Sequence, residues 1–160
     1  MKINTNKIKI ITEYQPISLQ IEGITLLSIE EAKQVPENLR AIDDWYWLRT
    51  PGGVDYCTMF VGRSVDRSSY FGGSCVNYQG GAIRPVLRID NRIPTDLIIG
   101  DKIEHAVYTW TVIADDLILC DEAIGYTAFR TDMNASDAND YEASDVKRWL
   151  EKWARGCGII

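Results

Sequence analysis

The chain has 160 residues, of which 46% are hydrophobic and 25% are charged, and its formal net charge is −6. These proportions are typical of a globular domain and exclude a disordered chain or a fibrous repeat. The acidic residues are concentrated between residues 101 and 145. This distribution disfavours direct binding to a nucleic-acid backbone and favours a partner with a basic surface.

The sequence predicts a cytoplasmic protein that does not bind membranes. No apolar run approaches the roughly 20 residues that cross a bilayer, and the N-terminus lacks the apolar block of a signal peptide. The cysteines form no Cys-x-x-Cys pair, and thiols are usually reduced in the cytoplasm. A Cys57–Cys75 disulfide is the alternative to four free thiols at Cys57, Cys75, Cys120 and Cys157.

Short strands and one brief helix are predicted in the first part of the chain. Ser28 and Glu31 match a capping box, so a helix through Lys33 is expected before Pro36 interrupts it. The preceding runs are short and rich in β-branched residues, which favours strands. These strands are predicted at residues 8–14, 17–21 and 24–27.

The central segment combines strands with a long polar insert. Residues 45–49 alternate in the period-two pattern of a strand, and further strands are predicted at 56–61 and 82–89. Because Pro85 cannot donate a backbone hydrogen bond, the last strand should lie at a sheet edge or contain a bulge. The insert, residues 54–79, is rich in Gly, Ser, Tyr, Asn and Asp. Loops on a stiff scaffold are where binding residues concentrate.

The C-terminal part predicts a hairpin and the main helix. Residues 102–113 and 117–120 form the hairpin around residues 114–116. The helix, over residues 145–155, has Ser144 as its N-cap and is ended by Gly156. Its apolar positions recur at helical spacing. They are Val146, Trp149, Leu150 and Trp153.

Together these elements predict an α+β fold in one domain over residues 1–160. Mostly antiparallel strands carry a long loop insert, and one main C-terminal helix packs its tryptophans on a sheet. Residues 1–90 hold the strands, the short helix and the insert. Residues 91–100 are a predicted linker, and residues 101–160 pack the hairpin and helix on the same core.

Two segments resemble the motifs of an uncharacterised family of bacterial and bacteriophage domains. The family motifs are Trp-Trp-Leu-Arg-Ser-Pro-Gly and Gly-Val-Arg-Pro-Ala-Leu. The matching segments are Trp-Tyr-Trp-Leu-Arg-Thr-Pro-Gly at 45–52 and Gly-Ala-Ile-Arg-Pro-Val-Leu at 81–87. Further matches lie at 26–32, 110–113 and 141–150. The resemblance implies a C-type lectin-like fold, in which a long irregular loop region sits on a small antiparallel sheet.

One departure from the family is the order of its segments. Many members place the parts similar to 110–113 and 141–150 before the Trp-Trp-Leu-Arg motif, so this chain resembles a circular permutation of them. Such a permutation is tolerated where the two termini lie close together. In the motif cores, Arg49 and Arg84 are expected to be partly buried and paired with acids, because arginine forms planar pairs with carboxylates.

The leading hypothesis is a non-enzymatic, phage- or prophage-type binding protein that presents the insert to a protein partner. In the similar proteins the insert is rich in Tyr, Asn, Ser, Asp and Gly, the composition that serves antibody loops. A glycine-rich loop region with its aromatic residues folded inward is the alternative. The candidate contacts are Tyr56, Arg63, Arg67, Tyr70, Phe71, Asn77 and Tyr78.

Two other functions stay open. The protein could be an acidic, anti-CRISPR-like inhibitor that imitates phosphate charge in the basic groove of a host nucleic-acid-processing or defence system. Alternatively, a glycan-binding module could stack sugars on Trp45, Trp47, Trp149 and Trp153, although their spacing favours core packing. The acidic surface of the inhibitor would be Asp115, Asp116, Asp121, Glu122, Asp132, Asp137 and Asp140.

The sequence gives little support to catalysis, and no cofactor or metal is expected. His105 is the only histidine, and no phosphate-binding glycine motif is present. Adjacent acids, Asp43–Asp44 and Asp115–Asp116, are typical of turns, although glycosidases use paired carboxylates. Oxygen ligands for calcium lie in residues 132–140, but the glycine and glutamate of an EF-hand loop are missing. These oxygen ligands are Asp132, Asn134, Ser136, Asp137, Asn139 and Asp140.

Overall fold

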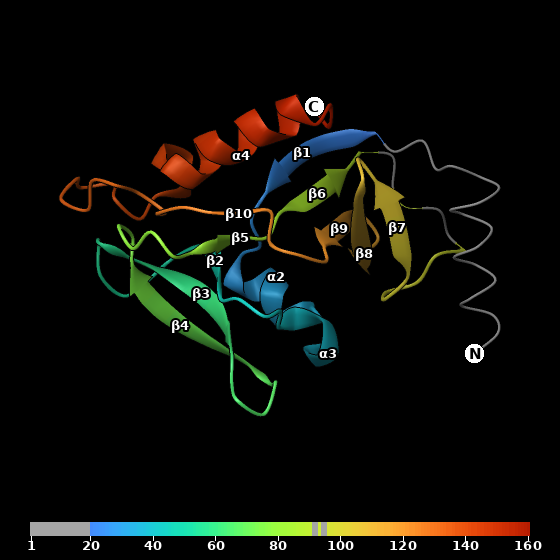
Figure 1. The fold of residues 1–160 in the computed structure, drawn as a ribbon, viewed down its shortest axis with the longest axis horizontal. Helices are drawn as coiled ribbons and strands as arrows, with labels where there is room; N and C mark the ends of the chain where they lie inside the picture. The colour runs from blue at the N-terminus through green and yellow to red at the C-terminus, as the bar shows by residue number, and fades with distance from the viewer. Residues whose placement is uncertain (1–19, 91–92, 94–95) are drawn as a thin grey trace.

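The computed structural model describes residues 20–90, 93 and 96–160, which form two five-stranded sheets and several helices (Figure 1). Sheet A has the strand order β1-β6-β9-β8-β7, and sheet B has the order β10-β5-β2-β3-β4. The elements are β1 (Ile21–Thr25), α2 (Ile29–Gln34), α3 (Glu37–Arg40), β2 (Tyr46–Pro51), β3 (Cys57–Arg63), β4 (Ser69–Cys75), β5 (Ala82–Ile83), β6 (Val86–Ile89), β7 (Lys102–His105), β8 (Tyr108–Ala114), β9 (Leu117–Cys120), β10 (Gly125–Tyr126), η2 (Tyr141–Ala143) and α4 (Asp145–Gly156).

The general α+β prediction is confirmed. Strand pairs are antiparallel except for β2 and β5, which pair in parallel at Tyr46 and Ala82. Helix α4 runs beside β1 at the top of the view in Figure 1. The strands predicted at residues 8–14 and 17–21 lie outside the described residues, except at Gln20 and Ile21. No helix in the described ranges is long and apolar enough to cross a membrane.

Both predicted helix starts are confirmed. Ser28 Oγ accepts a hydrogen bond from the Glu31 N–H, and the Glu31 carboxylate accepts one from the Ser28 N–H. Ser144 Oγ likewise accepts from the Lys147 N–H at the start of α4. Each bond satisfies an N–H that has no partner within the helix. Helix α4 extends through Gly156 itself, one residue beyond the predicted end.

The strand predicted over residues 82–89 is two strands that belong to different sheets. β5 lies in sheet B and β6 lies in sheet A, and the chain crosses between them at Arg84 and Pro85. Proline cannot donate to a ladder, so the pairing stops there. Its carbonyl still accepts a hydrogen bond from the Cys120 N–H at 2.9 Å. The prediction of a single edge or bulged strand is therefore wrong: β5 lies between β10 and β2, β6 lies between β1 and β9, and Pro85 joins the two sheets.

The two motif arginines differ in their partners. Arg49 is half-buried and forms the expected ion pair, with 2.6 Å between its Nη1 and Oε1 of Glu31. Arg84 is only 3% exposed, and the prediction of an acidic partner is wrong for it. Its guanidinium instead donates hydrogen bonds to neutral oxygens, because the carbonyls at the end of α3 face it and are aligned to accept. These oxygens are the carbonyls of Leu39, Arg40 and Cys120 and the hydroxyl of Tyr46.

The strand predicted over residues 102–113 is also two strands. β7 and β8 form a hairpin whose turn residues, Ala106 and Val107, have φ values of 52° and 62°. A left-handed two-residue turn matches the twist of the strands, and it is usually made by Asn or Gly. The sequence therefore carried no turn signal here, and the side chain of Val107 is 99% exposed at the tip.

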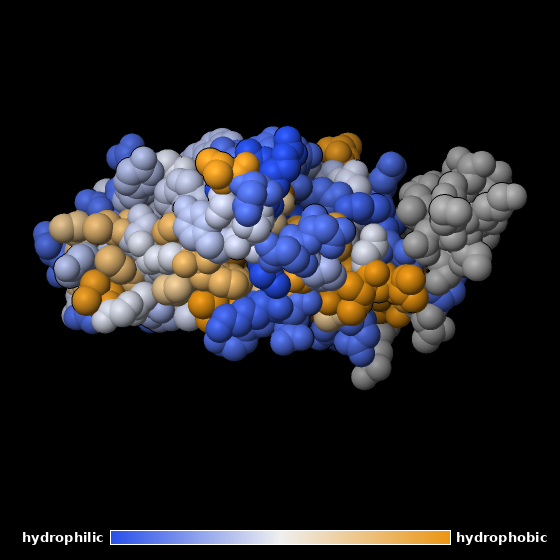
Figure 2. All heavy atoms as spheres, turned by 90° about the horizontal axis from the view of Figure 1, so that it is seen from below, coloured by the Kyte–Doolittle hydropathy of each residue, from blue (hydrophilic) through white to orange (hydrophobic). Residues whose placement is uncertain are grey.

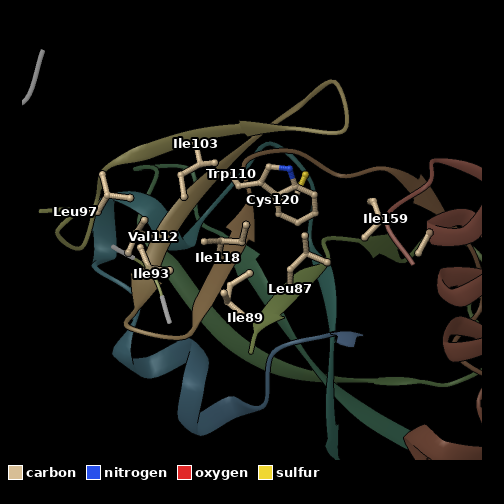
Figure 3. Close-up of a cluster of buried hydrophobic side chains, with 11 residues drawn as sticks. Leu87, Ile89, Ile93, Leu97, Ile103, Trp110, Val112, Ile118, Cys120 and Ile159 are labelled. Carbon is tan, nitrogen blue, oxygen red and sulfur yellow. The ribbon is translucent and has the colours of Figure 1, made fainter. Parts of the chain in front are cut away.

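One face of sheet A carries the first part of the core. Side chains from β6, β7, β8 and β9 point to the same side of the sheet, and Ile159, which follows α4, closes the cluster (Figure 3). Ile93 and Leu97 are buried in this cluster. The segment predicted as a linker therefore contributes side chains to the core.

The two faces of sheet B pack on different partners. Tyr46, Leu48 and Val61 face helix α2 and the second face of sheet A. Trp47 and Ile83 face the opposite way, toward α4 and η2. This face of sheet B, which carries Trp47, is covered near β2 and β5. Strands β3 and β4 extend away from α4 toward the lower edge of the view in Figure 1. This part of the sheet carries the candidate site.

Candidate binding site

The insert between the two motifs is mainly a β-hairpin: the strand predicted at 56–61 is confirmed as β3, whereas the long loop predicted after it is wrong because residues 69–75 form β4. β3 and β4 pair in continuous register from Cys57–Cys75 to Arg63–Ser69. The glycine and tyrosine content of the insert predicts a loop, but composition does not show that two segments of the insert pair through their backbones. Within the described residues, β4 is the edge strand of sheet B.

Side chains alternate strictly across the hairpin. Phe60 lies opposite Gly72, and Gly62 lies opposite Tyr70, so these four residues share one face. Phe71 lies on the other face and packs on the buried cluster beneath sheet B. The hairpin therefore has an inner face toward the core and an outer face of aromatic and glycine residues.

The outer face holds four aromatic residues in contact, named here the aromatic cluster: Trp45, Phe60, Tyr70 and Tyr78. The ring centroids of Trp45 and Phe60 are 4.9 Å apart, and those of Trp45 and Tyr78 are 5.7 Å apart. Phe60 and Tyr70 meet edge to face at 5.9 Å. Trp45 also meets the buried Trp47 edge to face at 4.8 Å, which ties the cluster to the core. Such pairs restrain the rings relative to one another.

Glycines let the rings lie flat on the backbone. A Cβ at Gly62 would lie 2.5 Å from Cζ of Tyr70, and a Cβ at Gly72 would lie 2.7 Å from Cζ of Phe60. A Cβ at Gly80 would lie 2.6 Å from Cε1 of Tyr78. Glycine in a strand often marks such a close approach. The positions of three of the four rings, those of Phe60, Tyr70 and Tyr78, therefore require a glycine next to the ring.

A pocket of about 220 Å³ opens over the aromatic cluster. Tyr70 and Tyr78 are 46% and 56% exposed, so their rings form walls that solvent reaches. Seen from below the view of Figure 1, the surface of the molecule shows hydrophobic residues in separate groups between hydrophilic ones (Figure 2). The pocket is lined by Trp45, Phe60, Tyr70, Gly73, Ser74 and Tyr78.

The structure brings only two of the seven predicted contacts, Tyr70 and Tyr78, into this pocket. Phe71 faces inward, with the Arg40 guanidinium 5.5 Å from its ring centre. Arg63 forms an ion pair with Asp43 at 2.9 Å.

The remaining predicted contacts are exposed elsewhere on the insert. Arg67 lies in the turn between β3 and β4 with φ of 72°. Tyr56 immediately precedes β3, and Asn77 follows β4 next to Tyr78. None of these three side chains lines the pocket.

Sequence reasoning missed Trp45 and Phe60 as pocket residues. The spacing of the tryptophans predicts that Trp45 packs in the core, and Phe60 lies within the strand predicted at 56–61. The available signal was the alternation of an aromatic residue with glycine at Phe60–Gly62 and at Tyr70–Gly72. In paired strands this alternation places each ring opposite a glycine.

A second pocket, of about 420 Å³, is lined mainly by acidic side chains and is named here the acidic pocket. The hydroxyl of Tyr126 donates a hydrogen bond to Asp44 at 2.5 Å, and this bond raises the pKa of the tyrosine. Lys102 pairs with Asp121 at 2.8 Å and neutralises part of the charge. The lining residues are Ile42, Asp43, Asp44, Asp121, Glu122, Ala123 and Tyr126.

The other acids of the predicted acidic surface do not join this pocket. Asp115 and Asp116 lie in the turn between β8 and β9. Asp132, Asp137 and Asp140 belong to the segment between β10 and η2, which lies at the left of the view in Figure 1, away from β8 and β9. The seven acids are therefore distributed over separate regions, and only Asp121 and Glu122 share a pocket.

The residues considered for calcium, sugar and acid–base chemistry have structural contacts. Asp132 accepts a hydrogen bond from the Asn134 N–H, and Asp137 pairs with Arg130 at 3.1 Å. Trp149 and Trp153 are half-buried against the core. In the described ranges, no group of three or more His, Cys, Asp or Glu side chains is arranged to hold a metal ion.

The single histidine lies at the end of β7. Its Nε2 is buried and has no hydrogen-bond partner in the part of the chain that the structure describes. Burial lowers the pKa of His105 below its usual value. A neutral imidazole packed beside the β7–β8 turn follows from this environment.

No protein-family model, no curated protein and no solved structure matches the chain.

Proposed function

We propose that the protein is a non-enzymatic binding module whose aromatic cluster receives a side chain from an extended segment of a partner protein. The observation that carries the proposal is the position of the pocket beside the edge strand β4. Aromatic residues that are already packed lose little conformational entropy on binding and often form the centre of an interface.

The hydrogen-bonding pattern of β4 favours an extended peptide. Ser68 precedes β4 and Val76 follows it, and both bond across the hairpin. The Ser64 N–H donates to Ser68 O, and the Val76 N–H donates to Tyr56 O. Alternation then turns the backbone groups of Phe71 and Gly73 away from β3, toward the open edge. A peptide that adds a strand there would project alternate side chains over the outer face. The net charge of −6 favours a segment that also carries lysine or arginine.

The proposal keeps the resemblance stated for the sequence. The protein would be a phage- or prophage-type domain with a C-type lectin-like fold, acting in the host cytoplasm without direct contact to nucleic acid or membrane. Small antiparallel sheets and a hairpin that presents aromatic residues are compatible with that resemblance. In this version the hairpin face, rather than irregular loops, makes the contact.

A selection from a displayed library of random peptides tests this function. Peptides enriched by the wild-type protein should carry an aromatic residue within an extended, basic sequence. The double variant Tyr70→Ala/Tyr78→Ala should lose their binding, whereas Tyr126→Ala should retain it, because Tyr126 is similarly exposed but lines the acidic pocket. N-methylation of the selected peptide, one residue at a time, should weaken its binding at alternate positions only, because only every second backbone N–H of an added strand points to β4.

Two results would contradict the proposal. One is retention of the selected peptides by the Tyr70→Ala/Tyr78→Ala variant. The other is binding of glycans on an array, lost in the same variant, together with no enriched peptide motif. That second result would assign the aromatic cluster to sugar stacking.

The acidic pocket supports a second candidate function, the inhibitor that occupies a basic groove. Asp43 and Asp44 join Asp121 and Glu122 there, so four carboxylates line one pocket. Affinity for a basic partner should then fall steeply with ionic strength. It should also be lost in Asp44→Asn/Glu122→Gln and retained in Tyr70→Ala/Tyr78→Ala. Weak salt dependence would exclude this candidate.

A further inference from the structure

Cys57 and Cys75 face each other at the open end of the β3–β4 hairpin. They are direct cross-strand partners in the register of the pair. The flanking hydrogen bonds show which kind of pair they form. The Cys57 N–H donates to Val54 O at 3.0 Å and its carbonyl accepts from the Gly52 N–H at 2.9 Å, so both groups point away from Cys75. The neighbouring Val76 N–H donates across the hairpin to Tyr56 O at 2.9 Å.

This pattern makes the cysteines a non-hydrogen-bonded pair of an antiparallel ladder. In such pairs the Cα atoms lie about 4.5 Å apart and the side chains are closest. A disulfide needs a Cα separation of about 4.4–6.8 Å. The backbone of the hairpin is therefore already placed for a bond between the two sulfurs.

The two thiols differ in accessibility. Cys75 is exposed and Cys57 is half-buried, and the two residues are direct partners across the hairpin. Burial is the main reason that the pKa of Cys57 is raised, and the neighbouring Cys75 raises it further. An oxidant from solvent therefore reaches Cys75 first and finds Cys57 next to it.

We propose that Cys57 and Cys75 are a redox-active dithiol that closes reversibly to a disulfide in exchange with a small disulfide oxidant such as oxidised glutathione. The Cys75 thiolate attacks one sulfur of the oxidant, whose S–S bond breaks and releases one glutathione thiolate. The Cys57 thiolate then attacks the Cys75 sulfur of the mixed disulfide and displaces the second glutathione. The protein loses two electrons and two protons, and the oxidant leaves as two molecules of glutathione.

The bond would link β3 to β4 at the end of the hairpin that leads to Tyr78, with its sulfurs on the face opposite to the aromatic cluster. Ser74 and Gly73, which precede Cys75, line the pocket, and the Tyr78 N–H donates to the Cys75 carbonyl at 3.2 Å. Because β4 is an edge strand, β3 is its only neighbour in the sheet order of the described residues. A covalent link to β3 would suppress opening of β4 and restrain Tyr78. This inference does not depend on the proposed binding function.

Incubation of the full chain in glutathione buffers of increasing oxidised fraction tests the proposal. After alkylation and digestion, mass spectrometry should find a Cys57–Cys75 peptide pair lighter by two hydrogens, formed in proportion to the oxidised fraction and reversed by reduced glutathione. Cys157, which is exposed at the end of α4, should carry a glutathione adduct instead, and the buried Cys120 should stay reduced. The Cys57→Ser variant should accumulate a glutathione adduct at Cys75.

Hydrogen exchange provides the structural readout. Oxidation should slow exchange of β4 amides that open with the strand by roughly 30-fold or more, the factor that corresponds to the lower end of disulfide stabilisation. The Cys75→Ser variant should show no such change. Two results would overturn the proposal. One is a stable glutathione adduct at Cys75 of the wild type with no Cys57–Cys75 bridge. The other is an oxidised fraction at Cys57 and Cys75 that does not exceed the fraction at Cys157.

Discussion

The ring of Phe60 lies over the backbone of Gly72, its cross-strand partner, where a Cβ would be 2.7 Å from its Cζ. The same ring is held by Trp45 at 4.9 Å and by Tyr70 at 5.9 Å. It cannot move off Gly72 without leaving these two contacts. The missing side chain at Gly72 thus sets the position of the centre of the aromatic cluster.

Gly72→Ala should lower the free energy of unfolding by about 1–3 kcal/mol, the usual effect of inserting a methyl group into packed side chains. Urea unfolding, followed by tryptophan fluorescence, measures this change. Gly73→Ala is the matched control, because its Cβ would find nothing closer than 4.0 Å. That substitution should be neutral or slightly stabilising. Equal loss of stability in both variants would mean that Phe60 does not rest on Gly72.

Arg84→Met should lower the free energy of unfolding by about 3 kcal/mol or more, since each buried acceptor left without a donor costs about 1–3 kcal/mol. Arg84→Lys should have an intermediate effect, because an ammonium group cannot reach all the oxygens that the guanidinium contacts. Arg148→Met is the control, since Arg148 is exposed and its contacts, with Asp145 and the Ala143 carbonyl, lie at the surface. Chemical denaturation of the three variants is the measurement, and a similar stability for Arg84→Met and Arg148→Met would contradict the expectation.

His105 should make the protein less stable as the pH falls below its usual pKa of 6.5. Burial lowers the pKa of His105 in the folded state, so the unfolded chain binds the proton more readily in this range, and falling pH favours unfolding. The His105→Gln variant removes this contribution while keeping every carboxylate. Its stability relative to the wild type should therefore rise between about pH 7.5 and about pH 5.5. A relative stability that is constant across this range would contradict a buried neutral imidazole.

The double substitution Ala106→Asn/Val107→Gly should stabilise the protein by about 1 kcal/mol or more, because a β-branched residue at positive φ is strained and Asn-Gly suits the same turn. Thermal unfolding should show a higher Tm. Val65→Gly is the control, because Val65 is also fully exposed in a hairpin turn but has no positive φ. It should give no gain, and a gain of equal size would attribute the effect to exposure rather than to backbone strain.

The local elements were predictable where their signals lie within a few residues. The caps at Ser28 and Ser144 depend on a hydrogen bond to an N–H only three residues away. The helix over residues 145–156 also shows its apolar face in its own spacing. The β7–β8 turn was missed for the same reason, since Ala106 and Val107 carry none of the usual turn residues. Only the pairing of the flanking strands forces them into that conformation.

The candidate site was predictable only in part. Composition indicated that the insert would be exposed and rich in tyrosine, and Tyr70 and Tyr78 do line a pocket. Composition did not indicate that residue 71 would turn inward, because this depends on which face of β4 meets the core. It also did not bring Trp45 to Phe60, since the two residues become neighbours only when β2 pairs with β3.

The sequence by itself determined the general α+β class and the two helix caps, because hydrogen-bonding capacity and hydrophobic spacing act over short distances along the chain. The tertiary structure alone decided that residues 82–89 join two sheets, that the insert folds into a hairpin, and that aromatic rings lie over glycines on its outer face. These features arise from strand register, and register is fixed by the burial of one face against residues far away in sequence.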